Sequence, residues 1–195
     1  MLEIQDLHVK FHSRDREAVG GVSLTIENGE ILGLVGESGS GKSVTAMSVA
    51  GLLPRKQCDY SGQILLDGQE LLHADRATLR KIQGADIGVV FQEPQSCMDP
   101  LMKIGPQVEE TLRIHTDLSR TERQKRALAA MAEAELPEPE TIYGKYPHEL
   151  SGGNVKINIV DGDFFKRCPG TVNVPEVIHP DDWRHNFVSF IGEDR

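Results

Sequence analysis

The sequence has few cysteines, no long apolar run and no excess of basic residues, which are the features of disulfide-rich, membrane-spanning and nucleic-acid-binding proteins. Its three cysteines, Cys58, Cys97 and Cys168, lie far apart and form no CxxC pair. That spacing indicates neither a disulfide framework nor a zinc site, and it fits a reducing cytoplasm. No apolar run approaches the length of a bilayer span, and the first residues lack the layout of a signal peptide. We therefore expect any action at a membrane to depend on a partner protein.

An excess of basic charge is also missing. The chain has 21 Lys and Arg against 30 Asp and Glu, which gives a formal net charge of −9. General nucleic-acid binding needs clustered excess Lys and Arg, so no nucleic-acid partner is expected. Any phosphate must instead be held by a local site. A length of 195 residues allows one good core, or one domain with a small subdomain.

The hydrophobic pattern changes along the chain from strand-like to helical. Alternating or short apolar runs predict strands at residues 2–11, 22–26, 31–35, 62–66 and 87–91. The nearly continuous run at 31–35 is typical of a strand covered on both faces. Helices are predicted at residues 44–53, 76–82 and 104–112, and from a capping box at Ser119 and Glu122 to about Leu136. These patterns indicate a mixed α/β domain with a helical insertion.

A phosphate-binding loop is predicted between the apolar run 31–35 and the helix that follows it. Residues 36–43 read GESGSGKS and fit the pattern GxxxxGK[ST]. The loop's candidate ligands for a nucleotide are Gly36, Ser38, Gly39, Ser40, Gly41, Lys42 and Ser43. The glycines let backbone N–H groups turn toward phosphate oxygens, and the helix adds its positive N-terminal end. Lys42 is expected to contact the β- and γ-phosphates, and the Ser43 hydroxyl to ligate Mg²⁺.

Two later segments narrow the choice among phosphate-loop proteins. The stretches VVFQEP at 89–94 and LSGG at 150–153 follow the loop in the order and approximate spacing of ATP-binding cassette (ABC) transporter ATPases. Residues 1–153 resemble that family throughout, and are most similar to the subgroup that powers uptake of peptides and nickel. The resemblance implies ATP and Mg²⁺ as cofactors, and a P-loop NTPase fold of the ABC type with a helical subdomain.

The same resemblance assigns roles to residues outside the loop. It places Phe11 where an aromatic ring stacks on adenine, although alternation alone also puts an apolar side chain there. Gln92 matches the glutamine that reaches Mg²⁺ and the attacking water. Ser151, Gly152 and Gly153 match the signature that contacts ATP held by the other subunit of a head-to-tail dimer. In isolation, SGG is a common loop sequence. Its assignment as the signature therefore depends on the preceding residues 146–150, which also resemble the family.

The resemblance stops after Gly153. Residues 154–195 contain no Leu, Ala or Met, yet hold five of the ten aromatic residues. The family would continue with a helix and an apolar strand that ends in Asp-Glu, and neither appears in that form. The run INIVD at 157–161 begins too soon after Gly153 to leave room for the helix, and Asp163 does not supply the glutamate in register. We therefore expect an ABC fold truncated before the Walker B strand, with no identifiable catalytic glutamate.

These observations lead to one main hypothesis and one alternative. The chain is expected to be an ATP-binding subunit of a peptide or nickel importer, divided into a core at 1–92, a helical subdomain at 93–153 and a divergent tail at 154–195. Its expected partners are transmembrane permease subunits and a second ATPase subunit, at the cytoplasmic face of the cell membrane. Whether hydrolysis survives is left open. The alternative is a non-catalytic remnant or interaction module that binds ATP weakly without hydrolysis.

Overall fold

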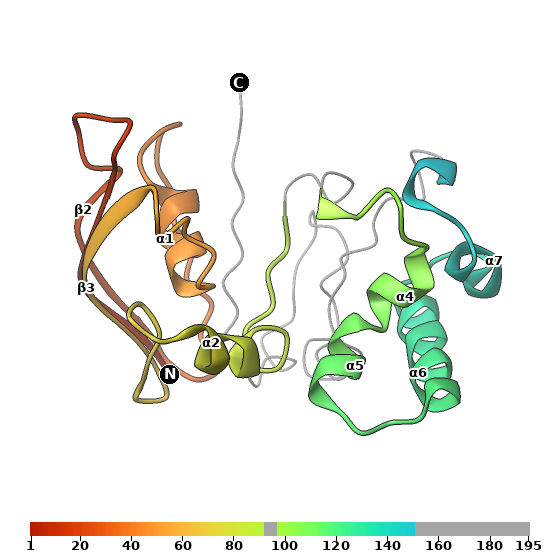
Figure 1. Cartoon of the computed structure of the whole chain (residues 1–195). Coiled ribbons are helices and arrows are strands. Elements are labelled where there is room, and N and C mark those ends of the chain that lie inside the picture. Colours follow the sequence, from red (N-terminus) through yellow and green to blue (C-terminus); the bar gives the residue numbers. More distant parts are fainter. Residues whose placement is uncertain (92–96, 151–195) are drawn as a thin grey trace. The chain divides into compact units, whose positions relative to one another are not determined.

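The computed structural model describes residues 1–91 and 97–150, which form two compact units (Figure 1). The described part of the first unit is residues 1–83, and that of the second is residues 84–91 and 97–150. Gln92, the signature residues 151–153 and the tail 154–195 lie outside the described residues. Within the described part, no helix is both long enough and apolar enough to cross a bilayer.

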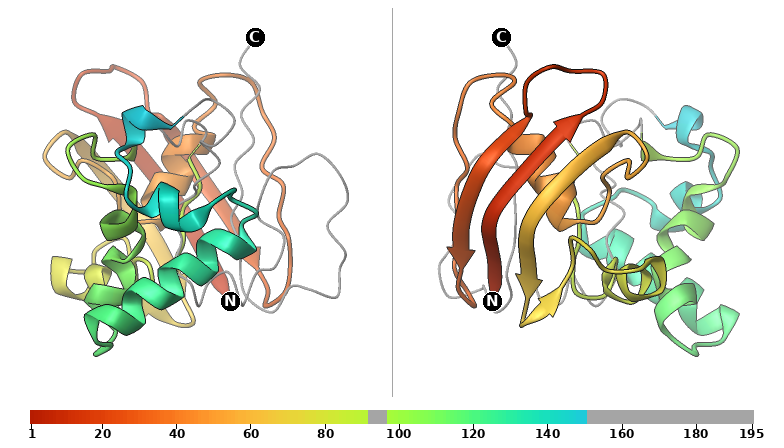
Figure 2. Two further views of the ribbon diagram at one scale, coloured as in Figure 1. Left: turned by 90° about the vertical axis from the view of Figure 1, so that its right-hand side faces the viewer. Right: turned by 60° about the vertical axis from the view of Figure 1, so that its left-hand side comes forward.

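A four-stranded antiparallel sheet forms the first unit. Its strands are β1 (Leu2–Phe11), β2 (Val19–Ile26), β3 (Cys58–Leu66) and β4 (Gln69–Glu70), in the order β2-β1-β3-β4. The three long strands lie side by side, with α1 behind them (Figure 2, right). The strands predicted at 2–11, 22–26 and 62–66 are confirmed.

The inward side chains of β1 change phase because the strand contains a bulge. Leu2, Ile4, Leu7 and Val9 are all buried, although Ile4 and Leu7 are three residues apart. Asp6 adopts a left-handed backbone (φ 47°), and the register with both neighbouring strands shifts there. On β3, a Cβ at Gly62 would lie 2.3 Å from the Asp6 carbonyl oxygen. The bulge thus needs a glycine opposite it, and it lets two pairs of apolar residues share one face.

Local sequence explains the ends of the other elements in this unit. The β3–β4 hairpin turns at Asp67 and Gly68, which both have positive φ, as a two-residue type I′ turn requires. Helix α2 (Arg76–Ile82) begins at Asp75, whose carboxylate accepts a 2.7 Å hydrogen bond from the Thr78 N–H. Helix α1 (Lys42–Val49) is shorter than predicted, because Gly51 adopts a left-handed conformation that ends it.

The predictions of strands at 31–35 and 87–91 are wrong for the described residues. Only Ile31 and Ile87 form isolated bridges, and the other residues of these runs have no strand assignment. Ile31 is 51% exposed and Val35 94% exposed. A buried parallel strand needs neighbours on both sides, and the strand expected to follow residue 153 is not recognisable in the sequence. Apolar composition alone therefore does not make these runs strands.

The second unit is helical. It contains α4 (Ile104–Val108), α5 (Glu110–His115), α6 (Arg120–Glu133), α7 (Pro139–Tyr143) and the 3₁₀ turn η1 (Pro147–Glu149). Ile104, Val108 and Leu112 are all buried, as their four-residue spacing predicts. The capping box at Ser119 and Glu122 is confirmed at the start of α6. The hydrophobic core of the second unit comprises Met98, Ile104, Val108, Ala127, Met131, Ala134, Leu136, Ile142 and Leu150.

Candidate functional site

The predicted phosphate loop, residues 36–43, lies in the first unit and leads directly into α1. Gly41 is the N-cap of this helix and adopts a left-handed backbone (φ 95°) that side-chain-bearing residues rarely adopt. A Cβ at this position would lie 2.3 Å from the Ala18 carbonyl oxygen and 3.3 Å from Val19 Cγ2. Glycine is therefore required at position 41 for two reasons, backbone conformation and space.

Lys42 folds back across the loop. Its Nζ donates to the carbonyl oxygens of Gly36 (2.6 Å) and Glu37 (2.9 Å), and lies 3.5 Å from Ser40 Oγ. These bonds tie the first residues of the loop to the first turn of α1. Within the described part of the chain, Lys42 forms no ion pair with a carboxylate. Its positive charge therefore remains available to an anion.

The other loop residues leave space and donors for that anion. Gly39 has φ 80°, and a Cβ there would meet nothing within 4 Å. Ser38, Ser40 and Ser43 are exposed. No side chain caps the N-terminus of α1, and no acidic residue lies in its first turn. This donor set, a lysine, hydroxyl groups and free helix N–H groups, fits the phosphates of a nucleotide.

Hydroxyl oxygens also suit Mg²⁺, which prefers oxygen ligands alongside substrate phosphates. Ser43 has the right chemistry and exposure for that role, whereas Gln92 lies outside the described residues. The described residues contain no group of three or more His, Cys, Asp or Glu side chains that could hold a metal ion. A metal at this site would thus depend on the nucleotide for several of its ligands.

Phe11 ends β1 in the same unit as the loop. It is half-buried, pairs with Cys58 across the sheet, and begins the turn to β2 with its carbonyl oxygen bonded to the Arg14 N–H. The connection from Phe11 reaches Ala18, which contacts Gly41 of the phosphate loop. Sequence patterns did not identify Ala18, because it contributes a backbone oxygen and no distinctive side chain.

The segment leading to the signature is held firmly within the second unit. The Ile104 N–H donates to the Lys145 carbonyl oxygen at 2.9 Å, the Tyr146 N–H donates to Glu149 Oε2 at 2.7 Å, and Leu150 is buried in the core. Ser151, Gly152 and Gly153 follow at once but are not described. The roles predicted for these three residues and for Gln92 therefore stay predictions, because all four lie outside the described residues.

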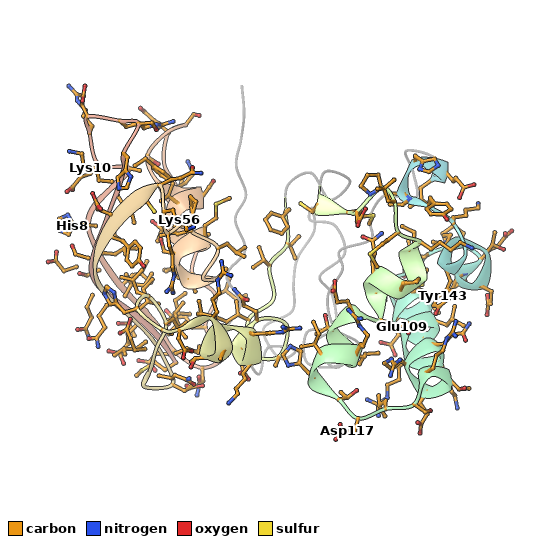
Figure 3. All side chains as sticks on the ribbon, viewed as in Figure 1. His8, Lys10, Lys56, Glu109, Asp117 and Tyr143 are labelled. Carbon is orange, nitrogen blue, oxygen red and sulfur yellow. The ribbon has the colours of Figure 1, made fainter. Side chains whose placement is uncertain are left out.

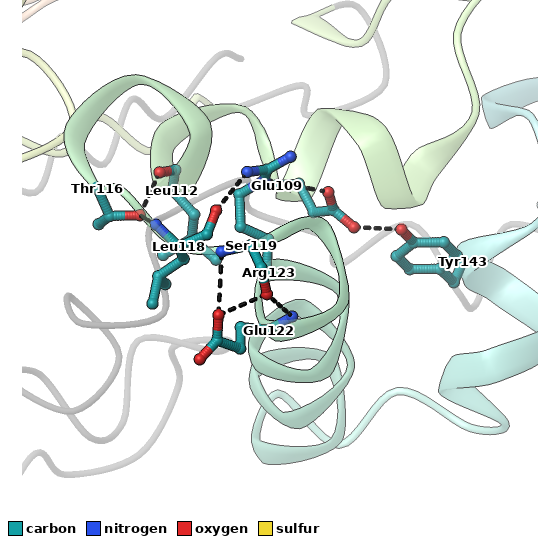
Figure 4. Close-up of polar contacts among 8 residues, drawn as sticks. All are labelled: Glu109, Leu112, Thr116, Leu118, Ser119, Glu122, Arg123 and Tyr143. Carbon is teal, nitrogen blue, oxygen red and sulfur yellow. Dashed lines mark hydrogen bonds and ion pairs between the residues drawn. The ribbon is translucent and has the colours of Figure 1, made fainter.

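A partly buried polar network supports this helical unit (Figure 4). Glu109, at the junction of α4 and α5, accepts a hydrogen bond from the Tyr143 hydroxyl, and its other oxygen lies 3.7 Å from Arg123 Nε. Burial and the bond to Glu109 raise the pKa of Tyr143 to about 12. Arg123 also donates from Nη1 to the Leu118 carbonyl oxygen at 2.6 Å. The network links α4, α6 and α7, and no sequence pattern predicted it.

The chain is similar to ABC transporter proteins over most of its length. A family model described as ABC transporter matches residues 19–160. The probable D,D-dipeptide transport ATP-binding protein DdpD of Escherichia coli (strain K12) is 44% identical over 156 residues, covering 78% of this chain and 48% of the relative. The oligopeptide transport ATP-binding protein OppD of Bacillus subtilis (strain 168) is 36% identical over 156 residues, covering 78% and 44%. The chain thus spans about half the length of the curated relatives it matches.

Solved structures resemble the fold as well. The ATP-binding cassette MJ0796, in a dimeric post-hydrolysis state bound to ADP and Pi, matches with a TM-score of 0.70 and 29% identity. That match covers 82% of this chain and 67% of the solved one. CbiO1 from Clostridium perfringens, part of the transporter complex cbiONQ, matches with a TM-score of 0.60 and 26% identity, covering 83% and 59%.

Proposed function

This chain belongs to the ABC transporter family, and on that premise we propose that it is the nucleotide-binding part of an ATP-binding subunit serving peptide import. The observation that supports this most is the phosphate loop, in which Lys42 and the uncapped N-terminus of α1 offer donors to an anion. Peptides are the proposed substrate class because DdpD and OppD, both half-matched by this chain, are named for dipeptide and oligopeptide transport. Nickel is the second substrate class that the sequence resemblance implies.

Each site residue has a proposed role toward Mg·ATP. Lys42 and the loop N–H groups bind the phosphates, Ser43 and Gln92 ligate Mg²⁺, and Phe11 stacks on adenine. Ser151, Gly152 and Gly153 are proposed to contact ATP held by a second subunit, which the dimeric state of the similar cassette supports. In the complete family, ATP hydrolysis supplies the free energy that drives the membrane partner between its states. The proposed partners are permease subunits at the cytoplasmic face of the membrane. Residues 93–153 are proposed to be the helical subdomain that contacts them. The proposed core is residues 1–92, and residues 154–195 form a divergent tail.

We expect nucleotide binding without turnover. The binding loop is complete, whereas a water-activating carboxylate is not identifiable in the sequence. The experiment measures Mg·ATP affinity and phosphate release for the 195-residue chain, for Lys42→Ala, and for Lys56→Ala. Lys56 is an exposed lysine of the same unit and a matched control for the lost charge (Figure 3). Loss of charge-assisted bonds in Lys42→Ala should weaken binding about tenfold to a hundredfold, while Lys56→Ala stays unchanged.

Two outcomes would contradict this proposal in different ways. Equal affinity in the unmodified chain and Lys42→Ala would overturn the nucleotide role of the loop. Phosphate release that disappears in Lys42→Ala would leave the nucleotide role intact but overturn the expectation of no turnover. Release that persists in Lys42→Ala would be assigned to a contaminating ATPase.

A further inference from the structure

His8 lies between two carboxylates on the face of the sheet away from α1 (Figure 3). Its Nδ1 is 3.0 Å from Glu17 Oε2, and its Nε2 is 3.2 Å from Asp6 Oδ1. A neutral imidazole has one N–H, so it donates to one carboxylate at a time; only the imidazolium donates to both. The two contacts are therefore complete only when His8 is protonated.

The groups around His8 favour that proton. The bond to Glu17 is the largest factor that raises the pKa of His8, desolvation opposes it, and Asp6 adds to the rise. Gly20 of β2 and Ser61 of β3 face His8 across the sheet and carry no charge. Farther along β1, Lys10 pairs in register with Asp59, which also lies 3.2 Å from His12 Nε2. The charges that contact His8 directly are thus both negative.

Glu17 connects this cluster to the phosphate loop through its neighbour in sequence. Ala18 is anchored to β1 by a 2.8 Å bond from its N–H to the Val9 carbonyl oxygen. Its own carbonyl oxygen is the atom that a Cβ at Gly41 would meet at 2.3 Å. The residue next to Glu17 therefore forms the wall against which the turn into α1 packs.

We propose that His8 and Glu17 act as a positioning pair for the phosphate loop, so that protonation of His8 tightens the binding of nucleotide phosphates. The inference rests on the proposed function, because it requires that this loop binds a nucleotide. Protonated His8 fixes the Glu17 side chain, and Glu17 fixes the backbone of Ala18 against Gly41. Neutral His8 holds one carboxylate only and leaves that wall less constrained.

The direction of the pH effect follows from the raised pKa. A group whose pKa is raised by its partners contributes fully below its ordinary value of 6.5, and the contribution is lost as the pH rises through the raised value. Because Glu17 is 47% exposed, the effect should be modest. We expect the affinity for Mg·ATP to be about threefold tighter at about pH 6 than at about pH 8, once the titration of ATP itself is subtracted.

The experiment compares Mg·ATP affinity of the full chain at those two pH values with that of His8→Gln and His12→Gln. In His8→Gln, the remaining pH dependence of the affinity comes from the titration of ATP itself. We expect the additional pH dependence of the unmodified chain to be absent from this variant. His12→Gln is the matched control, because His12 also contacts a carboxylate, Asp59, but not Glu17. An equal pH ratio in the unmodified chain and His8→Gln would overturn the inference alone. Absence of binding at both pH values would overturn the proposed function together with it.

A reciprocal measurement needs no substitution. Linkage requires that, if protonation of His8 tightens nucleotide binding by some factor, bound nucleotide lowers the acid dissociation constant of His8 by the same factor and so raises its pKa. The His8 ring proton can be titrated by NMR in the full chain, with and without saturating Mg·ADP. An upward shift of the His8 midpoint is the expected result. An unmoved His8 midpoint in the saturated protein would overturn the inference.

Discussion

Individual polar side chains hold the irregular segments of this protein by bonding to backbone groups. Lys42 bonds to two carbonyl oxygens of the phosphate loop. Gln107, which is buried, donates to the carbonyl oxygens of Asp99 and Met102 and accepts from the Asp99 N–H. Buried polar groups need such partners, since an unpaired one costs about 1–3 kcal/mol. Single residues, rather than regular elements, therefore define these loops.

Tyr143 provides a prediction at the residue scale. Its hydroxyl donates to Glu109, a carboxylate that is largely buried. Tyr143→Phe removes that charge-assisted bond while Arg123 keeps its contact with the other oxygen, so the free energy of unfolding should fall by about 1.5–3 kcal/mol. Urea denaturation measures the change. Tyr60→Phe is the control, because the Tyr60 hydroxyl has no hydrogen bond within the described residues, and equal losses would contradict the assignment.

The same bond predicts how stability changes in alkali. The pKa of Tyr143 is raised from its ordinary value of 10.0 to about 12, so the folded state holds the hydroxyl proton more tightly than the unfolded chain does. The stabilisation is therefore fully present below pH 10 and is lost as the pH rises toward 12. The difference in unfolding free energy between the native chain and Tyr143→Phe should shrink over that interval.

At the scale of elements, the start of α6 is the clearest example of a helix specified by its own sequence. Ser119 Oγ accepts from the Glu122 N–H at 3.3 Å, and Glu122 Oε2 accepts from the Ser119 N–H at 3.0 Å. Ser119→Ala should lower the free energy of unfolding by about 1 kcal/mol. Thr121→Ala, at an exposed position of the same turn, should cause no loss, because alanine favours helix. Urea unfolding of both variants decides the matter, and matching effects would count against the cap.

Acid should weaken the same cap. The bonds from Ser119 lower the pKa of Glu122 below its ordinary value of 4.5. A lowered carboxyl pKa contributes stability above that ordinary value, and the contribution is lost as the pH falls through the lowered one. The loss caused by Ser119→Ala should therefore diminish below pH 4.5.

Elements with local determinants and strands with clear alternation were predictable from the sequence, whereas the fate of two short apolar runs was not. The helix at 76–82 and the capping box of α6 agree with their predicted positions, because caps and spacing act within a few residues. The runs at 31–35 and 87–91 have strand composition but no strand, because a strand exists only with a neighbour. The loop at 36–43 and the helix after it were predictable from the motif, while the phosphate-binding role of the loop stays a prediction. Ala18 and His8 were not, because their contacts arise only once β1 and β2 pair.

At the scale of the whole molecule, exposed apolar side chains predict limited solubility. Val35 is 94% exposed and Leu101 85% exposed. Val35→Ser should reduce light scattering at a fixed concentration and change the free energy of unfolding by less than about 0.5 kcal/mol. Val9→Ser, at a position with 0% exposure, should instead cost about 2 kcal/mol or more. Similar destabilisation by the two variants would mean that Val35 is covered in solution.

The bulge at Asp6 also bears on folding fidelity. If β1 slipped along β3, the left-handed backbone at Asp6 would lie opposite a residue that has a side chain. The Cβ of that residue would then collide with the Asp6 backbone, as a Cβ at Gly62 would. A flat pair of strands has no such obstacle and can pair in several alignments. The bulge and Gly62 thus restrict β1 and β3 to one register, and they disfavour the mispaired sheets from which aggregation starts.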